Sequence, residues 1–126
     1  MTSEVVSDNT PYLSPIELAR HVLDEVSSRG ATDSVLLDVR GLTTIADYFV
    51  VSTVSSTRQM RALRDVLDRE LPVVGGRHPR IEGAPTDLWV LADFGDVVVH
   101  ILSEEGRMYF RLEEFWADAP IVLRVQ

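Results

Sequence analysis

The sequence predicts an α/β fold in which helices pack on a mixed sheet of four or five strands. In two stretches of the chain, apolar residues recur at helical spacing after a serine that can cap a helix. Short runs rich in valine, leucine and isoleucine lie between and after them, and two of the later runs flank a short link that fits a hairpin. The chain has 126 residues, the size of one domain, and should bury roughly two-thirds of its unfolded surface on folding.

The first predicted element is a helix over residues 15–29. Ser14 is a suitable cap, Pro15 suits the first helical position, and Glu17 stands where a capping box requires an acid. The apolar stripe that follows at helical spacing consists of Ile16, Ala19, Leu23 and Val26. We therefore expect this helix to pack one face on the sheet.

Two strands and a second helix are predicted next. Residues 34–39 and 48–53 are near-continuous apolar runs, which is typical of strands covered on both faces. A serine-rich turn then caps a helix over about residues 56–70. Its expected buried stripe consists of Met60, Leu63, Val66 and Leu67.

The second half of the chain predicts mostly strands. Residues 80–82 can form a short strand, and residues 88–92 and 97–102 form two more, joined as a hairpin. A helical stretch over 104–116 follows, and residues 121–125 form either a final strand or an extended tail. The hairpin makes part of the sheet antiparallel.

Composition limits the class of protein. Residues 1–13 are polar and aperiodic, so we expect a flexible tail ahead of a single domain over 14–126. The tail lacks the basic and apolar segments of a targeting peptide, and no apolar run approaches the roughly 20 residues of a membrane span. The chain has no cysteine, which excludes disulfides, thiolate zinc sites and cysteine nucleophiles. We expect a cytoplasmic protein without contact to membranes.

Charge is unevenly distributed along the chain. The formal net charge is −8, which argues against a general nucleic-acid binder. Residues 58–81 hold six arginines and three acids, whereas residues 82–126 hold nine acids and three arginines. The arginines Arg58, Arg61 and Arg64 are either a solvated helix face, paired with acids of the same helix, or a contact to RNA. The acidic end favours a basic partner.

Catalytic motifs are missing from the sequence. It contains neither of the glycine-rich phosphate-binding patterns nor a serine-nucleophile elbow. The carboxylates at strand ends and turns are Asp38, Asp47, Asp93 and Asp96. Aspartate is common in turns for its own hydrogen bonding, and the alternative is a magnesium-dependent enzyme that uses these residues. We expect no resident metal or cofactor.

Aromatic residues and one histidine mark the acidic end. His100 interrupts an apolar run, which indicates either a core or edge histidine bonded to a neighbour or a contact to a partner. Six aromatic residues interleave with the acids: Trp89, Phe94, Tyr109, Phe110, Phe115 and Trp116. Each can be a core residue, but together with the acids they have the composition of a contact surface for a basic partner.

An ordered set of motifs resembles the ribosomal silencing factor (iojap-like) family. The segments are LDVRG at 37–41, IADYFV at 45–50, STRQM at 56–60, EG at 82–83, WVLADFGDVVVH at 89–100 and RMYFRLEEFW at 107–116. The resemblance runs from about residue 15 to 118. It implies a sheet with nucleotidyltransferase-like topology, without catalysis. Val54 stands where the family usually has glycine or a small residue, and the Gly-Ser pair and Asp-x-Asp motif of a nucleotidyltransferase are missing.

The resemblance also implies a role. Such a protein docks on the large ribosomal subunit through that subunit's fourteenth-numbered protein and blocks joining of the small subunit, which represses translation when nutrients are scarce. It needs no small-molecule substrate, and some members form homodimers when free. The expected contact residues are Trp89, Asp93, Asp96, His100, Arg107 and Tyr109, with Glu82, Glu104 and Glu105 as acidic partners for basic side chains. Of these, His100 and Asp93 are the most suited to support the fold instead.

Overall fold

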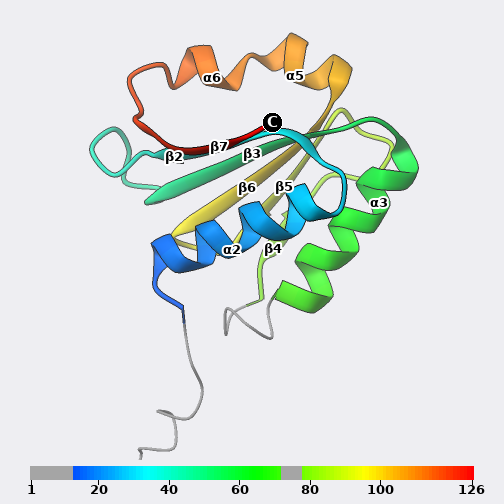
Figure 1. Ribbon diagram of the computed structural model, residues 1–126, viewed down its shortest axis with the longest axis horizontal. Coiled ribbons are helices and arrows are strands. Elements are labelled where there is room, and N and C mark those ends of the chain that lie inside the picture. The colour runs from blue at the N-terminus through cyan, green and yellow to red at the C-terminus, as the bar shows by residue number, and fades with distance from the viewer. Residues whose placement is uncertain (1–12, 72–77) are drawn as a thin grey trace, which may run out of the picture.

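The computed structural model describes residues 13–71 and 78–126, which form one sheet with helices on both faces (Figure 1). The strands are β2 (Thr32–Asp38), β3 (Tyr48–Val54), β4 (Arg80–Glu82), β5 (Trp89–Asp93), β6 (Val97–Ser103) and β7 (Ile121–Val125). Their order is β4-β5-β6-β3-β2-β7. The pair β3–β6 is parallel and the other neighbours are antiparallel, so the predicted mixed sheet and hairpin are confirmed. The sheet has six strands rather than four or five because both short edge segments, β4 and β7, pair with it.

Helix α2 (Pro15–Ser28) begins as its sequence predicts. The Ser14 side chain accepts a hydrogen bond from the Glu17 backbone N–H, and the Glu17 carboxylate accepts one from the Ser14 N–H. These bonds satisfy backbone donors that the first turn leaves unpaired. The predicted tail lies outside the described residues except for Leu13, which packs half-buried against the core.

The second predicted helix is α3 (Thr57–Asp65), which continues into a π-helical turn, η1 (Val66–Glu70). Ser56 caps its start by accepting from the Gln59 N–H. The turn widens because the Leu71 N–H donates to the Val66 carbonyl, five residues back. The predicted stripe of Met60, Leu63, Val66 and Leu67 is buried.

The helical stretch predicted over 104–116 is two helices, α5 (Glu104–Phe110) and α6 (Leu112–Phe115). Arg111 separates them with φ 51° and ψ 50°, the left-handed conformation that residues other than glycine rarely adopt. This conformation ends the helical hydrogen bonding and turns the chain. The predicted helical stretch is therefore present, but it is interrupted at Arg111.

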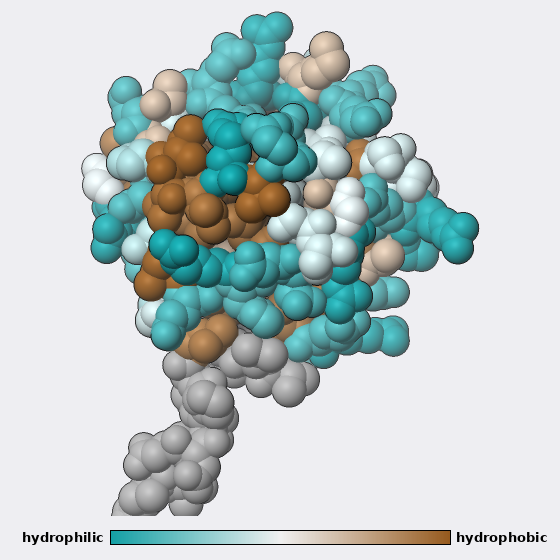
Figure 2. All heavy atoms as spheres, viewed as in Figure 1, coloured by the Kyte–Doolittle hydropathy of each residue, from teal (hydrophilic) through white to brown (hydrophobic). Residues whose placement is uncertain are grey.

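The helices cover the two faces of the sheet unequally (Figure 1). Helices α2 and α3 lie on one face over the larger core cluster, which includes Leu23, Leu63 and Ile101. The short helices α5 and α6 lie on the other face over a smaller cluster, which includes Phe49 and Val98. Apolar side chains also remain visible between these layers, along the β7 edge (Figure 2).

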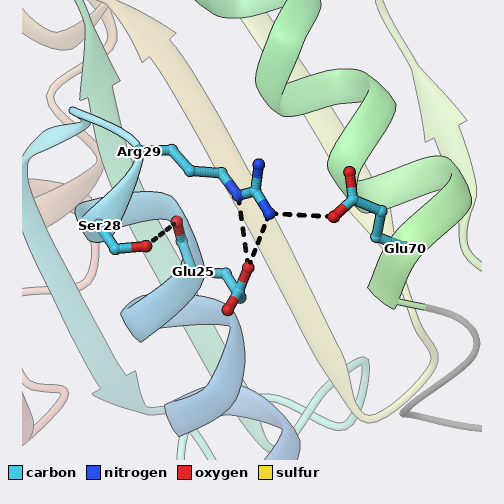
Figure 3. A network of polar contacts seen from close by, with 4 residues as sticks. All are labelled: Glu25, Ser28, Arg29 and Glu70. Atoms are coloured by element: carbon cyan, nitrogen blue, oxygen red, sulfur yellow. Dashed lines mark hydrogen bonds and ion pairs between the residues drawn. The ribbon is translucent and has the colours of Figure 1, made fainter.

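A polar network ties the end of α2 to η1 (Figure 3). Arg29 Nη2 lies 2.9 Å from a carboxylate oxygen of Glu70 and 3.2 Å from one of Glu25. Ser28 Oγ donates to the Glu25 carbonyl at 3.0 Å. Since these groups are largely exposed, they orient the two helices more than they stabilise the fold.

Candidate partner-binding surface

The β5–β6 hairpin places Trp89 and His100 on the same face of the sheet, under α5 and α6. In β5, Trp89, Leu91 and Asp93 are half-buried and alternate with buried residues that point to the other face. His100 stands opposite Leu91 in β6. The indole Nε1–H of Trp89 donates to Nδ1 of His100 at 3.1 Å. The interpretation of His100 as a buried histidine bonded to a neighbour is therefore confirmed.

Aromatic rings extend from this pair towards α5. The Phe49 ring in β3 meets His100 edge-on, with centroids 4.8 Å apart. On the other side, Trp89 contacts Phe110 at 4.8 Å, and Phe110 contacts Tyr109 at 5.0 Å. Such tilted and edge-on pairs are favourable ring geometries. The sheet face and the α5 helix thus share one row of rings.

The outer ends of the two short helices are exposed and apolar. Phe115 is 80% exposed, Met108 77% and Tyr109 74%. Phe115 contacts the half-buried Trp116, whose ring in turn packs edge-on against Phe49. Large apolar side chains exposed together mark interaction sites in soluble proteins. We call the surface formed by Trp89, Met108, Tyr109, Phe110, Phe115 and Trp116 the aromatic surface, and the buried His100 lies beneath it.

A hollow of about 290 Å³ adjoins the aromatic surface where β4, β5 and β6 meet. Its apolar walls are Ile45, Phe49, Leu91 and Val98, and its polar lining is Arg80, Glu82, Asp93 and His100. Arg80 Nη2 lies 3.3 Å from Glu82 and 3.9 Å from Asp93. Three of the residues predicted from the sequence, Glu82, Asp93 and His100, therefore line one hollow.

Asp93 and Asp96 have roles in the hairpin link. The Asp93 carboxylate accepts from the Gly95 N–H at 2.8 Å, as the turn-chemistry interpretation predicts. The Asp96 side chain is exposed, and its main-chain oxygen accepts from the N–H groups of Asp47 and Tyr48. Asp96 is not among the residues that line the hollow.

Arg107 lies inside the fold rather than on the aromatic surface. Its guanidinium donates twice to Glu113, at 2.8 and 2.7 Å, once to Thr53 Oγ1 at 2.6 Å and once to the Asp33 carbonyl at 2.8 Å. The side chain is 12% exposed. The guanidinium bonds hold the pKa of the Glu113 carboxyl below its usual value. Arg107 therefore joins α5 and α6 to the sheet.

Glu104 and Glu105 lie at the start of α5, in a different hollow of about 280 Å³. That hollow is also lined by the turn before α3, including Ser55 and Ser56. Both glutamates are exposed, and they stand in the first turn of α5, where acids are favourable. They are separated from the hollow that contains His100.

The arginines of α3 are only partly engaged. Arg58 and Arg61 are exposed. Arg64 Nε donates to the Gly83 carbonyl at 3.3 Å. Among the described residues, no ion pair joins two members of this helix, and Glu70 instead pairs with Arg29. The predicted ion pairs between arginines and acids of this helix are therefore not found in the described part of the chain.

A catalytic metal site is not assembled in the described part of the chain. Within residues 13–71 and 78–126, no group of three or more His, Asp or Glu side chains is placed to hold a metal ion. Asp38 instead binds Arg40 at 2.8 Å, and these bonds lower the pKa of the carboxyl. The helices in these two ranges also lack the length and the apolar character that a membrane span requires.

Comparison with known proteins decides the family. A sequence model described as "Ribosomal silencing factor during starvation" matches residues 12–126. The chain belongs to the ribosomal silencing factor family. It is 36% identical over 106 residues to the ribosomal silencing factor RsfS of Halalkalibacterium halodurans, covering 84% of this chain and 91% of that protein.

Other members of the family are similar to this chain in fold and in sequence. A crystal structure of a Chromobacterium violaceum protein superposes with a TM-score of 0.77 at 29% identity, covering 83% of this chain and 88% of that one. A mouse relative named "Mitochondrial assembly of ribosomal large subunit protein 1" is 32% identical over 89 residues, which is 68% of this chain and 39% of that protein. The family is thus associated with ribosomes through the names of these silencing and assembly factors.

Several surface residues were missed by the sequence analysis. Phe49, Leu91, Val98 and Arg80 all line the hollow, but in the sequence they are indistinguishable from ordinary strand residues. The signal that could identify them is strand register, because β3 and β6 pair in parallel and β5 alternates faces. Met108 lies next to Tyr109 in α5, and only its 77% exposure identifies it as part of the surface.

Proposed function

We propose that this silencing factor docks on the large ribosomal subunit through the aromatic surface and the adjoining acidic hollow, by way of the subunit's fourteenth-numbered protein. The bound protein occupies the face that the small subunit needs, so silencing is steric and requires neither catalysis nor a cofactor. The result is lower translation in the cytoplasm when nutrients are scarce. The observation that carries the proposal is the exposure of Met108, Tyr109 and Phe115 on short helices beside a hollow that contains Glu82 and Asp93.

The exposed apolar side chains supply the affinity in this proposal. Burying a large apolar side chain contributes roughly 1.5–3 kcal/mol, and exposed tyrosine and phenylalanine are frequent centres of binding energy. The carboxylates Glu82 and Asp93 suit the rim, where charges attract a basic ribosomal surface and mainly speed association. Trp89 and His100 form the floor under these contacts.

A secondary contact to ribosomal RNA fits the arginines of α3. Arg58 and Arg61 are exposed, and no ion pair holds them among the described residues. Exposed arginines bind phosphates and make the affinity salt-dependent. Replacing both with glutamine should reduce the salt dependence of binding without abolishing it.

In the free protein we propose a homodimer, which analytical ultracentrifugation tests.

Co-sedimentation with isolated ribosomal subunits tests the docking. Wild-type protein should pellet with large subunits and not with small ones. Tyr109→Ala and Phe115→Ala should each weaken binding about tenfold or more without loss of thermal stability, because both side chains are exposed. Ile121→Ala, which trims a 52% exposed residue of the β7 edge, is the matched control and should bind normally. Wild-type protein that stays in the supernatant at low salt would refute the proposal.

A further inference from the structure

His100 has one buried atom whose bonding the fold does not account for. The side chain is 5% exposed, in the middle of β6. Its Nε2 is buried and has no hydrogen-bond partner among the described residues. Nearly all buried polar atoms in folded proteins are bonded, and each exception requires an explanation. His100 also lines the hollow described above, so a group that enters the hollow is a candidate partner for Nε2.

The neighbouring tryptophan determines where the histidine carries its proton. An indole N–H can only donate, and Trp89 Nε1 lies 3.1 Å from His100 Nδ1. Nδ1 is therefore an acceptor and holds no hydrogen. Burial keeps the ring neutral near pH 7, because it lowers the pKa of His100 to about 4. The single ring hydrogen is then on Nε2, which makes the unpartnered atom a hydrogen-bond donor.

The lining of the hollow selects the group that this donor can bind. An acceptor is needed. Arg80 faces both Glu82 and Asp93 in the lining of the hollow, so two carboxylates stand against one guanidinium, and the remaining negative charge disfavours a carboxylate or phosphate. An uncharged carbonyl oxygen meets no such repulsion. Ile45, Leu91 and Val98 provide walls for an apolar side chain next to that carbonyl. Ile45, at 67% exposed, is the least enclosed of these walls and the easiest to displace.

We infer that the hollow receives an uncharged segment of the docking partner, which offers a carbonyl oxygen to the Nε2–H of His100 and an apolar side chain to the walls. This inference rests on the proposed docking to the large subunit. Binding then satisfies a donor that the free fold leaves buried. The same bond makes His100 a specificity-determining residue, because a partner segment without an acceptor leaves Nε2–H unpaired.

Two substitutions separate the roles of the two ring nitrogens. His100→Asn places an amide near the Nδ1 position, so it keeps an acceptor for Trp89 and removes the Nε2 donor. His100→Gln reaches the Nε2 position and keeps a donor there, but it gives up the bond to Trp89. Binding to isolated large subunits should weaken about tenfold in His100→Asn and stay closer to wild type in His100→Gln. His21→Asn, on α2 across the sheet, is the control.

The outcomes distinguish this inference from the docking proposal. If wild-type protein fails to pellet with large subunits, the docking proposal is wrong. If wild-type protein pellets and His100→Asn binds as tightly, or His100→Gln loses as much, only the carbonyl inference is overturned. A structure of the complex with only a water molecule on Nε2 overturns it as well. Imidazole ¹⁵N spectra of the free wild-type protein should show the hydrogen on Nε2, and a hydrogen on Nδ1 would refute the premise whether or not the variants fold.

Discussion

Replacing Arg107 with methionine should destabilise the fold more than it weakens docking. Methionine keeps much of the aliphatic volume and removes the guanidinium, which makes two bonds to Glu113, one to Thr53 and one to the Asp33 carbonyl. The four bonds connect α5 and α6 to β3 and to the start of β2. Without them, the two short helices are held to the sheet by the small cluster that includes Leu112 and Ala119.

The expected loss follows from the exposure of each partner. The Glu113 side chain is 36% exposed, so water can replace part of its pairing, and we discount that pair to about 1–2 kcal/mol. The bonds to Thr53 and to the Asp33 carbonyl contribute about 1 kcal/mol together after water competes for their acceptors. Arg107→Met should therefore lower the free energy of unfolding by about 2–3 kcal/mol, which is a fall in Tm of roughly 10 °C for a domain of this size.

A double-mutant cycle with Glu113→Gln measures the pair directly. Urea unfolding of the wild type, both single variants and the double variant should give a coupling energy of about 1–2 kcal/mol. Binding to large subunits, measured where all variants are folded, should change less than threefold. A stability loss below about 1 kcal/mol together with a tenfold loss of binding would refute the reasoning, because Arg107 would then be a contact residue, as the sequence analysis expected.

Three further predictions concern stability. Burial lowers the pKa of His100 to about 4, whereas the pKa of an unfolded histidine is near 6.5. Between these pH values the unfolded state binds more protons, so the free energy of unfolding should fall by about 2 kcal/mol from pH 7 to pH 5. Urea unfolding at several pH values should show a much smaller fall in His100→Asn. Gly106→Ala should destabilise the fold by about 2 kcal/mol in thermal melts, because a Cβ at this position clashes with the backbone carbonyl oxygen of Leu88. Gly41→Ala, with no atom within 4 Å of the added Cβ, should be neutral. Ser14→Ala should cost about 1 kcal/mol through loss of the capping bond, and unchanged chemical denaturation would contradict that role.

The helices and strands were predictable where their signals are local. The capping box at Ser14, the Ser56 cap and the apolar stripes each depend on residues a few positions apart, and the structure has them in place. The break at Arg111 was not predictable, because a left-handed arginine has no composition signal and depends on what the chain packs against. Strand count was underestimated because an edge strand of three residues, such as β4, forms only when a neighbour pairs with it.

The candidate site was predictable in composition but not in arrangement. Trp89 and His100 stood out as an aromatic and a histidine in apolar runs, and the two side chains are hydrogen-bonded to each other. Nothing local showed that Arg107 would turn inward, since its partners Thr53 and Asp33 are 54 and 74 positions away. For the same reason Glu104 and Glu105, close to Tyr109 in sequence, line a different hollow from His100.

A subunit-joining assay tests the central claim most directly. Large and small subunits are mixed with increasing protein, and paired ribosomes are separated from free subunits by sedimentation through sucrose. The wild type should reduce the fraction of paired ribosomes in proportion to the large subunits it occupies, and Phe115→Ala should need about tenfold more protein for the same effect. Full pairing of subunits while the protein stays bound to the large subunit would contradict steric silencing.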